Sequence, residues 1–187
     1  NFSLRDKETG YICITPSGMD YGELAPEDIV VIDKKGGVID GNRKYSVEMP
    51  LHCAVYQERS DVFGICHIHS VFATAWASCD IQFPVIAAEV AALVGSRLET
   101  APYRRMGTSE LAEAVVKTLG NKDAVLMANH GVLAVGRDLD TAFGNAVVVE
   151  EGAKIAYCAR NIGTINILPE DECEALRKWA AANYGQK

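Results

Sequence analysis

The sequence predicts a layered α/β domain whose central sheet is mixed or largely antiparallel. Short apolar runs bounded by Gly, Asp or Asn indicate strands, and longer segments with helical spacing lie between and after them. This interleaving favours helices packed on a sheet. Several connections are too short for a helical crossover, so many neighbouring strands are expected to run antiparallel.

Each predicted strand is a short run rich in β-branched or other apolar residues. Runs of this kind fit strands that are buried inside a sheet. The expected strands are residues 11–15, 28–33, 62–69, 124–129 and 131–136.

The first two predicted helices have recognisable ends. The first is expected over residues 47–59, with Ser46 as its N-cap. The second is expected over residues 109–119, capped by Thr108 or Ser109 and ended by a glycine.

The two later helices are predicted from apolar spacing. The third begins after Asp138 and continues towards Arg160. The fourth begins near Pro169 and is expected to bury three residues, namely Cys173, Leu176 and Trp179.

The bulk composition limits the class of protein. A chain of 187 residues with 49% hydrophobic content fits one domain spanning residues 1–187. Its net charge of -7 argues against a nucleic-acid partner, although amides and hydroxyls can still bind one phosphate. No apolar stretch reaches the roughly 20 residues that span a bilayer. The six scattered cysteines, with no Cys-x-x-Cys pair, indicate a reducing cytoplasm.

The stretch "GICHIHS" (64–70) places His67 and His69 two residues apart in a predicted strand. Residues with this spacing project from the same face. The pair alone is a weak sign of a metal site. His130, in "MANHG", lies between two predicted strands before a glycine that suits a tight turn, and it is either a third ligand or a turn residue bonded to backbone. Three imidazoles would suffice for a catalytic zinc site.

Two more titratable residues lie on the first predicted helix. Glu48 stands at its start, where the helix dipole favours a carboxylate, and on spacing alone it could merely help to cap the helix. His52 follows one turn later on the same face and is expected to pack or hydrogen-bond rather than bind a metal.

Together these residues resemble the class II sugar-phosphate aldolases of the L-fuculose-1-phosphate aldolase and L-ribulose-5-phosphate 4-epimerase group. The resemblance extends from Asn1 to Tyr184 and is carried by "NFSLRD", "ITPSG", "SVE", "HIHS", "APYRRMGTSEL", "NHG" and "NYG". It begins inside that family's Gly-Asn-x-Ser segment, so we expect the family's N-terminal helix to be absent.

The resemblance implies a three-layer α/β/α fold, with a mixed sheet between helices, assembled as a homotetramer with active sites between subunits. It implies a zinc ion, with Mn²⁺ or Co²⁺ as alternatives, held by His67, His69 and His130. Glu48 would be the acid–base residue, and Tyr184 would close over the site.

The resemblance also assigns a phosphate-binding role to five residues. These are Asn1, Ser17, Gly18, Ser46 and Val47.

The implied activity is cleavage of a ketose 1-phosphate into dihydroxyacetone phosphate and a short aldehyde, through a metal-stabilised enediolate. The alternatives are a 4-epimerase, decarboxylase or dehydratase of the same family and, from another class, a non-catalytic adducin-like interaction module. Glu48 favours aldol cleavage over epimerisation, because the epimerases of this group tend to carry Asp there. Adducin-like domains have lost the metal histidines, whereas this chain keeps them.

Two positions depart from the family pattern. Val47 stands where a second hydroxyl residue is common, and Ala88 stands where the aldolases have a tyrosine that protonates the aldehyde oxygen. Glu89, the next residue, is either a substitute acid or an ordinary helix residue. These departures leave the aldehyde partner and the reaction subtype open.

Overall fold

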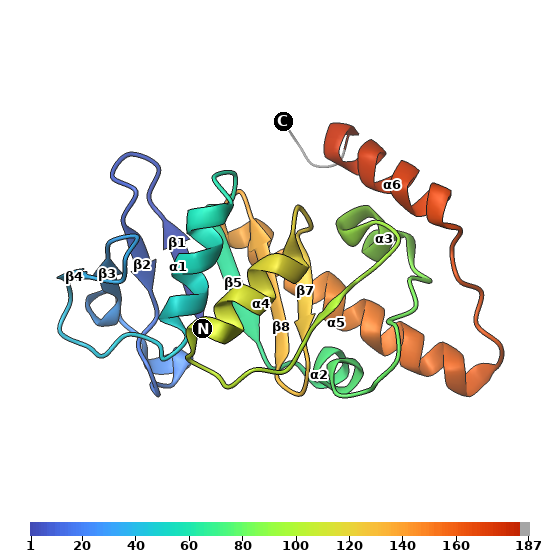
Figure 1. Cartoon of the computed structure of the whole chain (residues 1–187), viewed down its shortest axis with the longest axis horizontal. Coiled ribbons are helices and arrows are strands. Elements are labelled where there is room, and N and C mark those ends of the chain that lie inside the picture. Colours follow the sequence, from blue (N-terminus) through green and yellow to red (C-terminus); the bar gives the residue numbers. More distant parts are fainter. Residues whose placement is uncertain (184–187) are drawn as a thin grey trace.

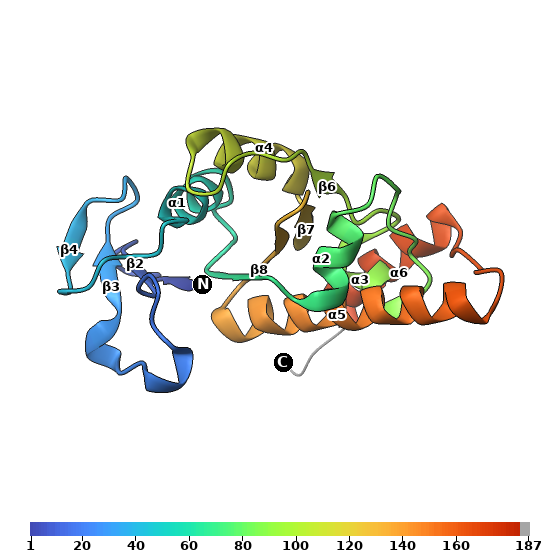
Figure 2. The same cartoon turned by 90° about the horizontal axis from the view of Figure 1, so that it is seen from below.

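The computed structural model describes residues 1–183 and contains one sheet with helices on both faces (Figures 1 and 2). The strands are β1 (Phe2–Arg5), β2 (Ile12–Ile14), β3 (Val30–Ile32), β4 (Val38–Asp40), β5 (Gly64–Ile68), β6 (Thr100–Ala101), β7 (Ala124–Met127) and β8 (Gly131–Gly136). Their order is β4-β3-β2-β1-β5-β8-β7-β6. The β6–β7 pair is parallel and the other neighbours are antiparallel, which confirms the predicted mixed sheet.

The helices form the outer two layers. They are α1 (Met49–Glu58), α2 (Val71–Ala77), α3 (Ala88–Val94), α4 (Ser109–Leu119), α5 (Leu139–Ile162) and α6 (Glu170–Asn183), with short 3₁₀ turns at Tyr21–Glu23 and Pro26–Asp28. Figure 2 shows α1 and α4 on one side of the sheet and α2, α3 and α5 on the other, while α6 packs against α3. The predicted three-layer architecture is confirmed.

Side chains of the central strands alternate between two apolar cores. Ile65 of β5 belongs to the core under α1 and α4, and Cys66 belongs to the core under α5. Because alternate residues of a strand share a face, His67 projects to the same side as Ile65. The strand therefore directs this histidine towards the layer that contains α1.

The start of α1 differs from the prediction. The helix begins at Met49 with Glu48 in the N-cap position, so the expectation that Ser46 is the N-cap is wrong. The Ser46 amide donates to the carbonyl of Thr15 (3.1 Å), which holds the chain extended up to this point. The Ser46 hydroxyl still accepts a bond from the Glu48 amide (3.2 Å), so it orders the turn that precedes the helix.

The expected burial of α6 is correct in its first turn and wrong further along. Cys173 is fully buried and Leu176 packs against the core, but Trp179 is 57% exposed. Residues three apart on a helix are separated by 300°, so each step rotates the apolar face by 60°. After two steps the face has turned away from α3.

Two further findings concern the described chain as a whole. Within residues 1–183 no helix combines the length and the apolar character that a membrane crossing demands. All six cysteines, which lie between positions 13 and 173, are free thiols.

Candidate metal and acid–base site

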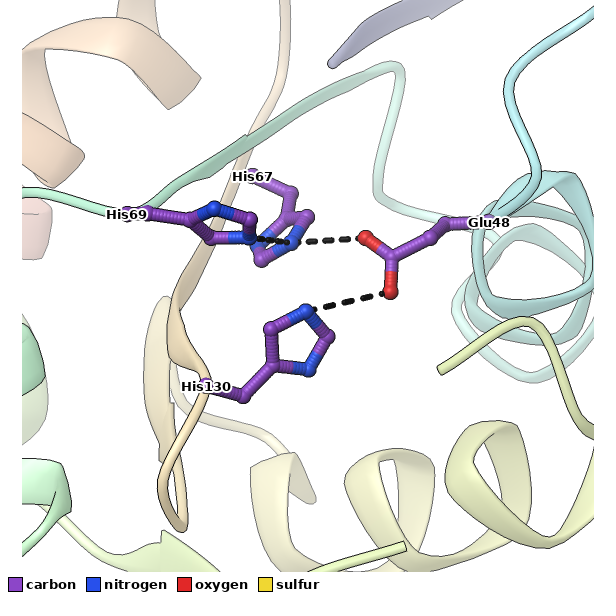
Figure 3. A group of neighbouring side chains, drawn as sticks. All are labelled: Glu48, His67, His69 and His130. Atoms are coloured by element: carbon purple, nitrogen blue, oxygen red, sulfur yellow. Dashed lines mark hydrogen bonds and ion pairs between the residues drawn. The ribbon is translucent and has the colours of Figure 1, made fainter. Parts of the chain in front are cut away.

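Four side chains that are distant in the sequence converge beside the end of the central strand (Figure 3). Glu48 comes from the start of α1, and His130 comes from the turn between β7 and β8. His67 lies near the end of β5, and His69 follows directly after that strand. Each offers one possible ligand atom, and these atoms all lie within 4.8 Å of one another. The structure thus brings together the four residues that the sequence singled out.

A tight turn brings His130 next to the end of β5. Asn129 adopts a left-handed conformation with φ 55°, and the His130 amide donates to the carbonyl of Met127 (3.0 Å). At Gly131, an added Cβ would lie 2.5 Å from the carbonyl oxygen of Ile68. The absence of a side chain at position 131 therefore allows the close approach of the strands that carry the histidines.

The hydrogen bonds of His67 determine which ring nitrogen is available. Nδ1 lies 2.9 Å from the carbonyl oxygen of Val132, which can only accept, so Nδ1 carries a proton. In the neutral ring, Nε2 is then a bare lone pair. It lies 2.6 Å from Oε2 of Glu48 and 3.1 Å from Nε2 of His69. A cation shared between these atoms would remove the repulsion between facing lone pairs.

Two further atoms of the site lack a hydrogen-bond partner within residues 1–183. Oε1 of Glu48 and Nε2 of His130 lie 3.3 Å apart, a separation that fits an ion pair only if His130 is protonated. Both atoms are buried, and neither makes a hydrogen bond within residues 1–183. Unsatisfied buried polar atoms cost about 1–3 kcal/mol each. Three imidazoles and one carboxylate form a donor set that fits a divalent metal ion.

The site keeps its groups in the protonation states that metal binding requires. Burial alone would raise the pKa of Glu48, but its hydrogen bond to His67 and the charges of His67 and His130 outweigh this and lower the pKa to about 2. Burial lowers the pKa of His69 and of His130, and neighbouring histidines add to this effect. Near pH 7 the carboxylate is therefore ionised, and these two imidazoles are neutral.

Four of the five residues expected to bind phosphate gather just before α1. The Ser17 amide donates to the carbonyl of Lys44 (2.9 Å), and this pairing holds Ser17 and Gly18 alongside the segment that leads to Ser46 and Val47. Gly18 has φ +71° and nothing within 4 Å of an added Cβ, so space remains beside the turn. Val47 is 48% exposed, while Ser46 is buried.

Asn1 lies beside the carboxylate. Its Nδ2 is 3.3 Å from Oε2 of Glu48, and its Oδ1 is 2.6 Å from Nε2 of His52. His52 is fully buried and hydrogen-bonded, as the sequence predicted, and it stays outside the metal-binding group. Sequence reasoning missed Ser3, which bonds His52 at 2.6 Å. The available signal was that Ser3 lies two residues after Asn1 in the same stretch, "NFSLRD".

Two of the singled-out positions do not join the group, and a third is not among the described residues. Tyr184 lies outside the described residues. Ala88 and Glu89 form the exposed first turn of α3, and Glu89 is absent from the set of potential ligands found within residues 1–183.

Known proteins resemble this chain over most of its length. A family described as "Class II Aldolase and Adducin N-terminal domain" matches residues 1–157. A 5-deoxy-D-ribulose 1-phosphate aldolase from Bacillus thuringiensis serovar kurstaki is 38% identical, with 100% of this chain and 87% of the relative aligned. An L-ribulose-5-phosphate 4-epimerase from Salmonella paratyphi C is 33% identical, with 100% of this chain and 89% of the relative aligned.

The likeness extends to three dimensions. A solved structure of an L-fuculose 1-phosphate aldolase superposes with a TM-score of 0.90 at 38% identity. The match covers 95% of this chain and 83% of that one.

Proposed function

Because this chain belongs to the class II aldolase and adducin N-terminal domain family, we propose that it is a metal-dependent aldolase. It would cleave a ketose 1-phosphate into dihydroxyacetone phosphate and a short aldehyde. The observation that carries the proposal is the convergence of Glu48 with His67, His69 and His130 within 4.8 Å. Relatives named for 5-deoxyribulose 1-phosphate and fuculose phosphate make these two ketoses the first substrates to test.

The three histidines would hold a divalent ion, with zinc preferred because its usual catalytic sites use three protein ligands. Mn²⁺ and Co²⁺ are the alternatives. When bound, the ion supplies Lewis-acid stabilisation for the negative charge that develops as the carbon–carbon bond beside the ketone breaks.

Glu48 would be the acid–base residue. Its pKa of about 2 keeps the carboxylate ionised and able to accept a proton from the hydroxyl of the carbon that becomes the aldehyde. The same carboxyl group can then return that proton to the carbon of the ketone product. Oε1 is the better placed atom, because it makes no hydrogen bond within residues 1–183.

The substrate phosphate would bind just before α1. Gly18 and Val47 are exposed residues, and their backbone amides, together with the hydroxyl of Ser17 and the segment at Ser46, could offer donors to an anion. This location lies next to Glu48 in the chain and would hold the reacting carbons near the histidines. The side-chain amide of Asn1 has a second N–H for the same anion, since its side-chain contacts within residues 1–183 use Oδ1 and one N–H.

We further propose a homotetramer with each site completed by a neighbouring subunit. His69 is exposed and Val47 is half exposed, so the site opens on the surface of the single chain. Tyr184 would contribute as the residue that closes over the substrate. Size-exclusion chromatography with light scattering tests the assembly, and a monomer with full activity would contradict it.

One experiment separates cleavage from the second candidate, 4-epimerisation, which the epimerase relative favours. Zinc-loaded protein is incubated with 5-deoxyribulose 1-phosphate, L-fuculose 1-phosphate and L-ribulose 5-phosphate. Release of dihydroxyacetone phosphate, which is detected by a coupled enzyme that reduces it, supports the aldolase. Conversion of L-ribulose 5-phosphate to its epimer without release of that product supports the epimerase, and no reaction with any of the three contradicts both.

A further inference from the structure

A line of buried hydrogen bonds leads from Glu48 into the core beneath α1. Oε2 of Glu48 contacts Nδ2 of Asn1 (3.3 Å), and Oδ1 of Asn1 contacts Nε2 of His52 (2.6 Å). Nδ1 of His52 contacts the hydroxyl of Ser3 (2.6 Å), which lies 2.9 Å from the hydroxyl of Tyr56. We call these five residues the relay. The proposed chemistry uses Glu48 and leaves the buried end of the relay without a role.

The direction of every bond in the relay follows from Glu48. An ionised carboxylate only accepts, so the side chain of Asn1 must present its NH₂ group to Glu48 and its oxygen to His52. That oxygen also only accepts, and His52 must therefore donate from Nε2. In a neutral ring Nδ1 is then an acceptor and takes its proton from the Ser3 hydroxyl. The Ser3 hydroxyl then accepts from the hydroxyl of Tyr56, which lies 2.9 Å away and also 3.0 Å from the backbone carbonyl of Ser3.

Burial keeps the ring of His52 neutral. The residue has no exposed surface, and this burial, helped by the charge of His67, lowers the pKa of His52 to about 3. A ring protonated on both nitrogens would also donate to the Ser3 hydroxyl and reverse the inner half of the relay. The neutral ring with its proton on Nε2 makes all four contacts, and burial favours it over the charged ring.

We infer that His52 is a positioning residue that, as the Nε2–H tautomer, fixes the Asn1 amide so that Nδ2 holds Oε2 of Glu48. This inference rests on the proposed acid–base role of Glu48. With Oε2 occupied by Asn1 and facing His67, the other oxygen, Oε1, remains free to take and return the proton. The relay thereby decides which carboxylate oxygen reacts.

The first test needs no substrate and no metal. Long-range ¹H–¹⁵N NMR spectra of the metal-free full chain, labelled with ¹⁵N-histidine, report which ring nitrogens carry protons. Assignment by comparison with a His52→Gln sample identifies the signal. We expect a neutral ring protonated on Nε2 near pH 7. A proton on Nδ1, or a fully protonated ring, would overturn the inference whatever the activity of the enzyme.

The second test measures turnover in two variants of one residue. His52→Leu fills the space without a donor, whereas the amide of His52→Gln can reach towards Asn1 and still donate an N–H. We expect His52→Leu to lower kcat by about 10–100-fold, as loss of an outer hydrogen-bond partner commonly does, with a smaller change in KM and full metal content. His52→Gln should recover most of kcat.

The outcomes distinguish positioning from packing. Equal losses in both variants, or a loss confined to KM, would overturn the inference. Asn145→Ala is the matched control, because it removes a 2.8 Å side-chain bond to the Val135 carbonyl at the other end of β8 and should leave kcat unchanged. If His52→Leu does not fold, the tautomer seen by NMR and the kcat of His52→Gln test the inference instead. If no substrate is turned over, the proposed function fails while the tautomer still tests the relay.

Discussion

Nε2 of His67 lies 2.6 Å from Oε2 of Glu48, where the end of the central strand meets the start of α1. Because the opposite ring nitrogen donates to Val132, this short contact places two acceptors face to face whenever the ring is neutral. A proton or a metal ion between the two atoms relieves the repulsion. A proton or metal ion bound between His67 and Glu48 would therefore link the central strand to the start of α1.

Removing the charge of Glu48 tests its role as acid–base residue. Glu48→Gln keeps the size of the side chain and one oxygen that can face the histidines, but it cannot take up a proton. We expect metal content to stay near that of the parent protein and kcat to fall by about 10²–10⁴-fold. Metal analysis and the cleavage assay give the two values.

Glu89→Gln is the control for that experiment, because Glu89 occupies the exposed first turn of α3. It should retain full turnover. A large loss at Glu89 with little loss at Glu48 would transfer the acid–base role to the substitute acid that the sequence left open.

Metal retention should depend on pH through the histidines. A protonated imidazole cannot bind a metal, and the ordinary histidine pKa is about 6.5. Because burial lowers the pKa of His69 and of His130, protons compete less well than at an exposed histidine, and affinity should fall only at pH values below that figure. Equilibrium dialysis against a zinc buffer from pH 8 to 4 measures this. Retention that does not change down to pH 4 would contradict histidine ligation.

Elements with caps and several turns were predictable from sequence, and short ones were not. Helix α4 has its predicted bounds, because Thr108 caps it and Gly120 ends it. Helices α2 and α3 have seven residues each, too few turns to display a helical period. Strand β6 has two residues and exists because Thr100 pairs with Leu126 of β7, which is a tertiary interaction.

The residues of the candidate site could be predicted from the sequence for a chemical reason. The hydrogen bonds that hold these residues in place could not. The chain contains only four histidines, so their spacing was informative. The bonds from Asn1 and Ser3 to His52 join residues about 50 positions apart, and folding alone brings them together. Asn1 was therefore assigned to phosphate alone, although it also contacts Glu48.

The buried ring of His52 should make the folded state sensitive to acid. Its pKa is about 3 when folded and about 6.5 when unfolded, so between these values the unfolded chain binds the extra proton. Stability from this residue is therefore complete above pH 6.5 and is lost as pH falls towards 3. Urea unfolding at pH 7 and pH 5 gives the change in the free energy of unfolding per pH unit. This pH dependence should be smaller in His52→Gln than in the parent protein, by at most about 1.4 kcal/mol per pH unit. Equal slopes would refute the assignment.

Gly131 should be essential for the close packing that carries His67 and His130. An added Cβ would lie 2.5 Å from the Ile68 carbonyl and 2.9 Å from the ring of His69, and backbone cannot move aside as a flexible side chain can. We expect Gly131→Ala to lower the free energy of unfolding by about 1–3 kcal/mol, a value typical of overpacking, and to weaken metal binding as well. Gly144→Ala is the matched control. Gly144 is an exposed residue within α5, and an added Cβ there would have nothing within 4 Å. That change should raise stability by about 0.5–1 kcal/mol, since alanine is the better helix former. Thermal unfolding of both variants gives the comparison, and an unchanged Gly131→Ala protein would show that the strand ends are not closely packed at this point.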